Sequence, residues 1–177
     1  MLQREPQHVE AREMLSSTYM NRAETFVRQG RRSEAVHDWK RMVDLGEGQK
    51  RAELRVNRAM ALAQLGDHAR ATAEVEDMLK GGSVPFYSHY NFVCVFSLSV
   101  RAVRDDAALF QAQRDELAKK YGAEAVKLLG RMKADRFFGS SGVVEYMKND
   151  TDLDPLLERA DYKKLLQELE REAAARK

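Results

Sequence analysis

The side chains best able to carry metal or nucleophilic chemistry are four histidines and a single cysteine, scattered singly along the chain. A zinc site needs several such ligands at short, regular spacing, which this chain lacks. His37 and Asp38 are adjacent, but helix neighbours point about 100° apart, so we expect no dyad and a surface role for the pair. Cys94 lies in the apolar run "FVCVF", which favours a small buried residue over a reactive thiolate. We therefore expect neither a metal nor another cofactor.

Phosphate chemistry has equally little support. The stretch "GSSG" at 139–142 resembles a phosphate-binding loop but is followed by no lysine and preceded by no strand, so it is interpreted as a loop or helix cap. A glycine-rich phosphate loop and the His-Arg-Asp and Asp-Phe-Gly motifs of protein kinases are missing from the sequence. The chain is expected not to be an enzyme.

Three arginines, Arg51, Arg55 and Arg58, recur at helical spacing and form one face. Such a face could meet an acidic partner or a phosphate group. Because Glu47 and Glu53 lie close in sequence, the preferred interpretation is a solvated face on which these acids balance the arginines.

Amide side chains recur more regularly than any of these groups. Asn21 and Asn57 open the matching stretches "NRAETFVRQG" and "NRAMALAQLG", 36 residues apart, and Asn91 follows 34 residues later. A primary amide has both a donor and an acceptor, so a row of them can bridge the N–H and C=O groups of an extended peptide. The same amides could instead hydrogen-bond the neighbouring repeat, and the sequence leaves both alternatives open.

Composition places these residues in one helix-rich domain. The chain has 177 residues, 44% hydrophobic and 33% charged, with three prolines and a net charge of +2. This near balance argues against a nucleic-acid partner, which normally requires a basic face. The apolar run 92–100 is too short to cross a membrane, and the charged first residues do not resemble a signal peptide. We expect a cytoplasmic protein with no membrane partner.

The 36-residue period predicts two copies of a helical hairpin. Each copy has a small residue, a large one, a glycine stop, and then a second small and large pair, all at helical spacing. The matched pairs are Ala23 and Ala59, Phe26 and Leu62, Gly30 and Gly66, Ala35 and Ala71, Trp39 and Val75, and Met42 and Met78. Glycine can adopt the left-handed conformation that ends a helix, and Ser33 and Asp67 are expected to cap the helices that follow.

The remaining third is expected to be helical too. Asp105 and Asp106 should cap one long helix whose apolar series runs from Phe110 to Met132. The stretch "GSSGVVEYMKND" predicts a loop and a short helix. In "DPLLERADYKKLLQELE", Asp154 and Asp161 are expected as caps, with Pro155 in a first helical turn. The apolar face of the last helix is formed by Leu165, Leu166 and Leu169.

This pattern resembles the tetratricopeptide repeat (TPR) family, in which small residues, aromatics and glycine hold these same places. The resemblance implies an all-α fold, a right-handed superhelix of antiparallel helix hairpins with capping helices at its C-terminal end. The expected organisation is a single domain over 1–177. Repeat 1 spans about 16–49, repeat 2 spans 52–85, a degenerate and extended repeat 3 spans 86–134, and capping helices occupy 140–177.

Three segments carry a narrower resemblance, "YNFVCVFSLSV", "YGAEAVKLLGRM" and "TDLDPLLERADYKKLLQELE". Together they look like the C-terminal TPR regions of bacterial serine/threonine protein kinases, of the planctomycete type. This resemblance implies a protein-interaction module that serves as the regulatory or docking tail of a kinase. The alternatives are a free-standing adaptor and a structural module that stacks on itself, so the oligomeric state, monomer or weak dimer, stays open.

In the TPR family the first helices of successive repeats line a concave groove that binds a peptide or partner segment. The groove residues implied here are Asn21, Asn57, Asn91, Glu24, Arg28, Met60, Tyr87 and Tyr90. Tyrosines are good anchors in a groove, although Tyr87 and Tyr90 could equally belong to the core. The mixture of tyrosine, methionine and glutamate suggests a mildly apolar peptide with a basic residue opposite Glu24 or Glu53.

Overall fold

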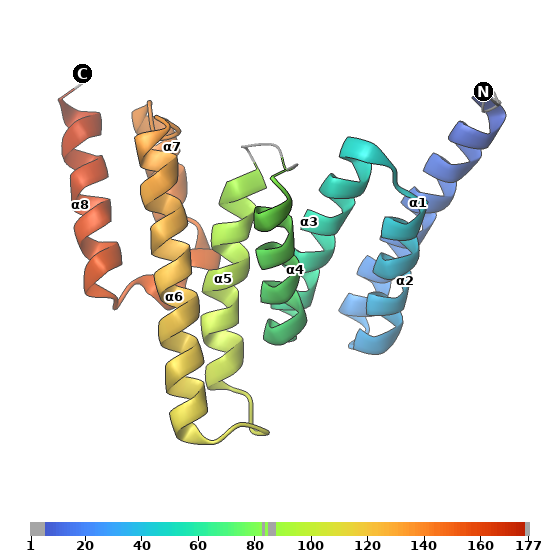
Figure 1. Cartoon of the computed structure of the whole chain (residues 1–177), viewed down its shortest axis with the longest axis horizontal. Helices are drawn as coiled ribbons and strands as arrows, with labels where there is room; N and C mark the ends of the chain where they lie inside the picture. The colour runs from blue at the N-terminus through green and yellow to red at the C-terminus, as the bar shows by residue number, and fades with distance from the viewer. Residues whose placement is uncertain (1–5, 83, 85–87, 176–177) are drawn as a thin grey trace.

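All regular structure in the described part of the chain is helical, in a computed structural model that describes residues 6–82, 84 and 88–175. Helices α1 to α6 follow one another across the molecule in chain order, and α8 lies at the opposite end from α1 (Figure 1). Their bounds are α1 Pro6–Arg28, α2 Arg32–Leu45, α3 Gly48–Gln64, α4 His68–Gly81, α5 Ser88–Arg104, α6 Gln111–Ala134, α7 Ser141–Lys148, η1 Thr151–Leu156 (a 3-10 helix) and α8 Ala160–Ala174.

The two predicted hairpins are α1–α2 and α3–α4, and they turn in the same way. Gly30 and Gly66 have φ of 73° and 86°, in the left-handed region that glycine tolerates best. Gly30 donates to the carbonyl of Val27 at 3.0 Å, and the next residue donates to Phe26 at 2.9 Å. The equivalent bonds of the second turn, 36 residues later, are 3.0 Å and 2.9 Å. The predicted glycine stops are confirmed.

Of the two helix caps predicted for the hairpins, one is confirmed and the other is wrong. Asp67 caps α4 by accepting from the backbone N–H of Arg70 at 3.2 Å, as expected. The prediction for Ser33 is wrong, because α2 begins at Arg32 and the position equivalent to Asp67 is Arg31, which makes no side-chain cap. Ser33 therefore lies within the first turn, and its hydroxyl donates to the carboxylate of Glu34 at 2.9 Å.

Three further cap predictions are also wrong, because none of these aspartates occupies the cap position of its helix. Asp106 lies in the loop before α6 and accepts from the N–H of Ala108 at 2.9 Å. Asp154 lies inside η1, which is capped instead by Asp150. Asp161 lies in the first turn of α8, and accepts from the N–H of Tyr162 at 2.9 Å.

The core contains the small positions of the repeat and, apart from the half-buried Phe26, the large ones too. Ala23, Ala35, Ala59 and Ala71 are all fully buried, which lets the two backbones of each hairpin approach closely. One cluster of buried residues joins α1, α2 and one side of α3, and a larger one extends from α3 to α8. The fold therefore has two adjoining cores.

Helix α5 is the centre of the larger core, since it packs against α3, α4, α6 and η1. The apolar run 92–100 is buried throughout, which explains its composition. None of the described helices is long and apolar enough to cross a membrane. The α5–α6 hairpin extends past the other helices at the lower edge of Figure 1.

The C-terminal elements cover α5 and α6. Helix α6 is a single long helix and α7 a short one, as predicted. Helix α8 packs on α6 and α7. Leu169 is buried and Leu165 and Leu166 are half-buried against the larger core, which confirms the predicted apolar face.

Candidate functional site

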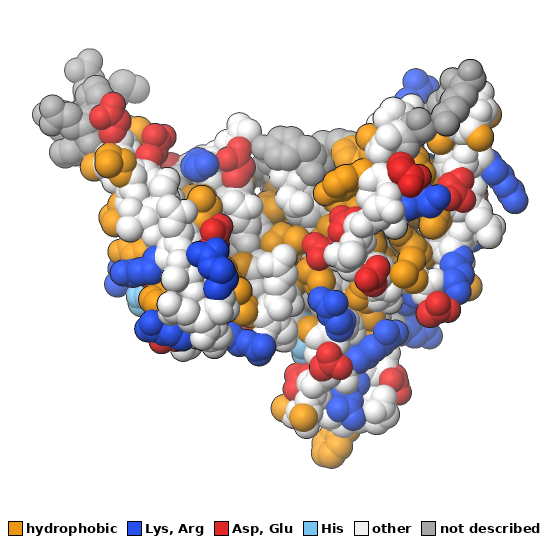
Figure 2. Space-filling view, turned by 180° about the vertical axis from the view of Figure 1, so that it is seen from behind, with side chains coloured by type: hydrophobic (Ala, Val, Ile, Leu, Met, Phe, Trp, Pro, Cys, Tyr) orange, Lys and Arg blue, Asp and Glu red, His pale blue; other side chains and the backbone are white. Residues whose placement is uncertain are grey.

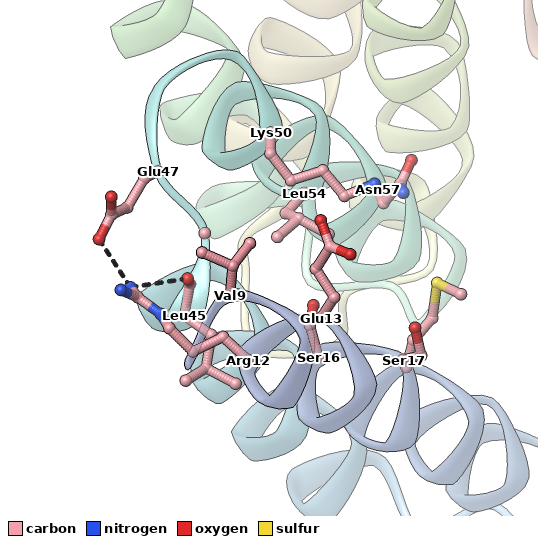
Figure 3. A pocket seen from close by; sticks show the side chains of 12 residues that line it. Val9, Arg12, Glu13, Ser16, Ser17, Leu45, Glu47, Lys50, Leu54 and Asn57 are labelled. Carbon is pink, nitrogen blue, oxygen red and sulfur yellow. Dashed lines mark hydrogen bonds and ion pairs between the residues drawn. The ribbon is translucent and has the colours of Figure 1, made fainter. Parts of the chain in front are cut away.

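A cleft of about 610 Å³ opens between α1 and α3, the first helices of the two hairpins. Helix α1 packs on α2, and α2 packs on α3, so the two walls of the cleft are joined through α2. Figure 3 shows side chains of both walls facing the space between them. Since α3 and α5 pack directly on each other, the cleft interrupts a series of first helices that is otherwise closed.

The loop between α2 and α3 forms one end of this cleft and is fixed to both walls. The guanidinium of Arg12, on α1, donates to the carbonyl of Leu45 at 3.0 Å and pairs with Glu47 at 2.8 Å (Figure 3). Gly46 lies so close to α3 that an added Cβ would be 2.7 Å from Cδ1 of Leu54. The loop can therefore hold the walls apart without filling the cleft.

The cleft combines apolar and polar surface. Leu54 is buried at its base, whereas Val9 and Met20 contribute apolar surface from α1. Ser17 adds a hydroxyl and Asn57 adds an amide from the α3 wall. A space of this size with several apolar side chains and a few polar groups is typical of a binding site.

The three asparagines do not share one site. Asn57 lines the α1–α3 cleft, and Asn91 lines a second hollow of about 420 Å³ beside Phe137 and Tyr146. Asn21 is exposed on α1 outside both hollows. Within residues 6–82, 84 and 88–175, none of the three side-chain amides forms a hydrogen bond. The described structure therefore offers no neighbouring-repeat partner for these amides.

The other predicted groove residues are dispersed. Glu24 and Arg28 are exposed on α1, and Arg28 donates to the hydroxyl of Thr25 at 3.2 Å. Met60 is half-buried and packs against the larger core. Tyr87 lies outside the described residues.

Tyr90 follows the core alternative and is not a free anchor. Its ring is 8% exposed, lies beside Phe137 and Tyr146, and its hydroxyl donates to Asp150 at 2.8 Å. Burial, together with this hydrogen bond, raises the pKa of Tyr90 above its usual range. The tyrosine thus connects α5 to the start of η1.

The arginine of the repeated Asn-Arg-Ala phrase has a role that sequence reasoning missed. Arg22 binds Asp38 through two hydrogen bonds of 2.6 Å and 2.7 Å. Arg58 binds Glu74 in the same bidentate manner, at 2.7 Å and 2.6 Å. Both pairs are 16 residues apart in sequence and join the two helices of one hairpin. The sequence did contain a signal for these pairs, because acidic residues, Asp38 and Glu74, occupy the same place in both copies.

This arrangement corrects two expectations. Arg55 and Arg58 do not form a solvated face balanced by Glu47 and Glu53, because both bind the buried carboxylate of Glu74 on α4. Hydrogen bonds from Arg22, which outweigh the opposing effect of burial, lower the pKa of Asp38. Asp38 is 1% exposed although its neighbour His37 is exposed, so only half of that adjacent pair lies on the surface.

One histidine, His68, is buried and links three elements. Its Nδ1 lies 3.2 Å from the hydroxyl of Tyr121 on α6, and its Nε2 lies 3.1 Å from Asp106 in the loop after α5. The hydrogen bond from the N–H of Ala108, followed by the bond to His68, lowers the pKa of Asp106. All three groups are occupied with one another, which fits a structural connection between α4 and α6.

Cys94 is 2% exposed, and burial raises the pKa of its thiol well above the usual range. The buried interpretation is confirmed.

In the part of the chain that the structure describes, no group of histidine, cysteine and acidic residues could hold a metal ion. The α1–α3 cleft is accordingly the best candidate for a functional site. Comparisons with known protein families, curated proteins and solved structures find no match for this chain, so the case for its function rests on this geometry.

Proposed function

We propose that this chain is a protein-interaction module of the TPR type that binds an extended segment of a partner in the α1–α3 cleft. The observation that carries the proposal is the cleft itself, open between two first helices and bordered by the amide of Asn57. That amide has no hydrogen-bond partner among the described residues, so it is available to a peptide backbone.

The outer face of α1 bears on the main alternative, self-stacking, in two ways. On α3, Leu54, Ala61 and Leu65 pack against the preceding hairpin. The equivalent positions on α1, 36 residues earlier, hold Thr18, Thr25 and Gln29. These polar positions suit a terminal repeat. Met14 and Leu15, one turn before Thr18, are however 73% and 42% exposed, and this apolar surface favours self-stacking as the second candidate.

A docking role within a larger serine/threonine kinase is the more specific form of the proposal. It is supported by the three C-terminal segments that resemble such kinases, and it assigns no catalysis to this chain. Determining the reading frame upstream of the codon for Met1 tests it. Kinase motifs in that frame would support the role, and an in-frame stop codon directly upstream would overturn it.

Two adjacent residues give a matched test of binding in the cleft. Ser17 and Thr18 are both exposed, but Ser17 lines the cleft and Thr18 belongs to the outer face of α1. Peptides are first selected from a displayed random library against the intact chain, and their affinities are then measured by fluorescence anisotropy. Ser17→Trp should fill the cleft and abolish binding, and Thr18→Trp should bind like the wild type. The proposal is overturned if no peptide is enriched, or if both variants bind equally well.

A further inference from the structure

Helix α1 carries a row of acidic side chains along the edge that faces the cleft. Glu10, Glu13 and Glu24 are exposed, and Glu13 lines the cleft (Figure 3). With Ser17 and Met20 they recur at steps of three and four residues, so all five share one side of the helix. As far as the described residues go, none of the three carboxylates has a hydrogen bond or an ion pair.

The two basic residues that line the cleft, Arg12 and Lys50, are already engaged. Arg12 is held by Glu47 and by the carbonyl of Leu45. Lys50, on the opposite wall, pairs with Glu53 at 3.6 Å. Glu53, one of the two acids expected to meet a basic ligand, therefore has a partner, and Glu13 takes its place. Among the described charged residues that line the cleft, Glu13 is therefore the one without an ion pair.

This charge is local, because the wider surface is mixed. On the face seen in Figure 2, acidic and basic side chains alternate with apolar ones, without a stripe of a single sign. A cationic ligand would thus find its complement along α1 and not over the molecule as a whole. Complementary charge of this kind favours one partner over others more than it adds raw affinity.

The spacing of the acids sets the length of the ligand. Glu13 and Glu24 are separated by about 16 Å along the axis at a helical rise of about 1.5 Å per residue. About five residues of extended chain cover this distance at about 3.3 Å each. Met20 on α1 and Leu54 at the base of the cleft lie between the walls at this level, and both can contact an aliphatic side chain.

We infer that the cleft binds an extended basic segment of a partner protein, with a lysine or arginine near each end and an aliphatic side chain in the middle. The inference rests on the proposed function and names its class of ligand. Glu13 and Glu24 would pair with the two basic side chains, and Asn57 would bind the backbone between them.

Three capped synthetic peptides test the inference on the intact chain. Each has two central leucines, flanked on both sides by two lysines, two glutamines or two glutamates, so that the outermost of these side chains are five residues apart. Anisotropy titrations should show binding of the lysine peptide, weakened by added salt, and little binding of the other two. Glu13→Gln and Glu24→Gln should each weaken binding about two- to fivefold, the range for exposed ion pairs. Glu116→Gln, which removes an exposed carboxylate on α6, is the control and should change nothing.

Equal binding of the glutamine and lysine peptides, or wild-type affinity in both glutamate variants, would overturn the inference. The proposed function fails in a different way. If library-selected peptides of another chemistry bind and lose affinity in Ser17→Trp, the cleft is a binding site but not one for basic segments. If Ser17→Trp changes the affinity of no peptide, the cleft itself is excluded.

Discussion

Glu74 joins the two helices of the second hairpin, and changing it tests why the Asn-Arg-Ala phrase is repeated. Its carboxylate is 9% exposed and accepts from Nε of Arg58 at 2.7 Å, from Nη2 of Arg58 at 2.6 Å and from Nε of Arg55 at 2.8 Å. Glu74→Gln keeps the shape of the side chain but replaces one acceptor oxygen with an amide NH₂. A donor then faces a guanidinium donor in a nearly buried site.

The expected loss follows from the hydrogen bonds involved. A hydrogen bond to a charged group contributes about 1.5–3 kcal/mol, and leaving a buried donor unsatisfied costs a similar amount. We expect Glu74→Gln to lower the free energy of unfolding by about 2 kcal/mol. For a chain of this length that corresponds to a Tm lower by about 4–8 °C.

Urea unfolding followed by far-UV circular dichroism measures this change. The matched control is Asp77→Asn, because Asp77 also binds Arg55, at 2.6 Å, but its side chain is 71% exposed. Exposed pairs contribute little, so the control should lose less than about 0.5 kcal/mol. Equal losses in the two variants, or a Glu74→Gln variant within about 0.5 kcal/mol of the wild type, would refute the role assigned to the buried carboxylate.

Three other predictions concern backbone, charge and thiol. Arg136 is the non-glycine residue with positive φ, 60°, in the described chain, so Arg136→Gly should raise the free energy of unfolding by about 0.5–1 kcal/mol. Gly30 also has positive φ, so Gly30→Ala should lower the free energy of unfolding by about 1 kcal/mol. Urea unfolding measures both changes. Because Arg22 lowers the pKa of Asp38, this pair stabilises the fold at pH values above the unfolded pKa of about 4, and the stabilisation is lost as the pH falls through the lower folded pKa. The free energy of unfolding, measured from about pH 5 to pH 2, should therefore fall less steeply in Asp38→Asn than in the wild type. Equal slopes would contradict this. Cys94 should react with a thiol reagent only on unfolding, so fast labelling of the native chain would contradict its burial.

The hairpins could be predicted because their signals are local. Gly30 and Gly66 need a left-handed conformation, and Ala23 and Ala59 need a close approach of two backbones. Both requirements restrict the residue type at one position, so the 36-residue period shows them directly. The long α6 and the short α7 follow in the same way from uninterrupted helical periodicity and from the glycines around 139–142.

The site could be predicted only in part, because it depends on contacts between distant residues. Asn57 was expected in a groove. The sequence around Asn57 does not show, however, that α1 stands away from α3 whereas α5 packs directly on α3. Tyr90 was open between groove and core, and its bond to Asp150, 60 residues later, places it in the core. The partner of Arg58 was sought in the adjacent Glu53 instead of Glu74, one helix further on.

The most direct test of the account is a two-dimensional NMR titration of the isotopically labelled chain with the lysine-flanked peptide. If the peptide binds where we propose, amide resonances should shift in residues 9–20 of α1 and 46–57 of the loop and α3, the two walls of the cleft. Resonances around Asn91 and Tyr146, in the second hollow, should stay unchanged. Shifts confined to that hollow would contradict the α1–α3 cleft as the binding site, and no shift at saturating peptide would contradict a basic segment as its ligand.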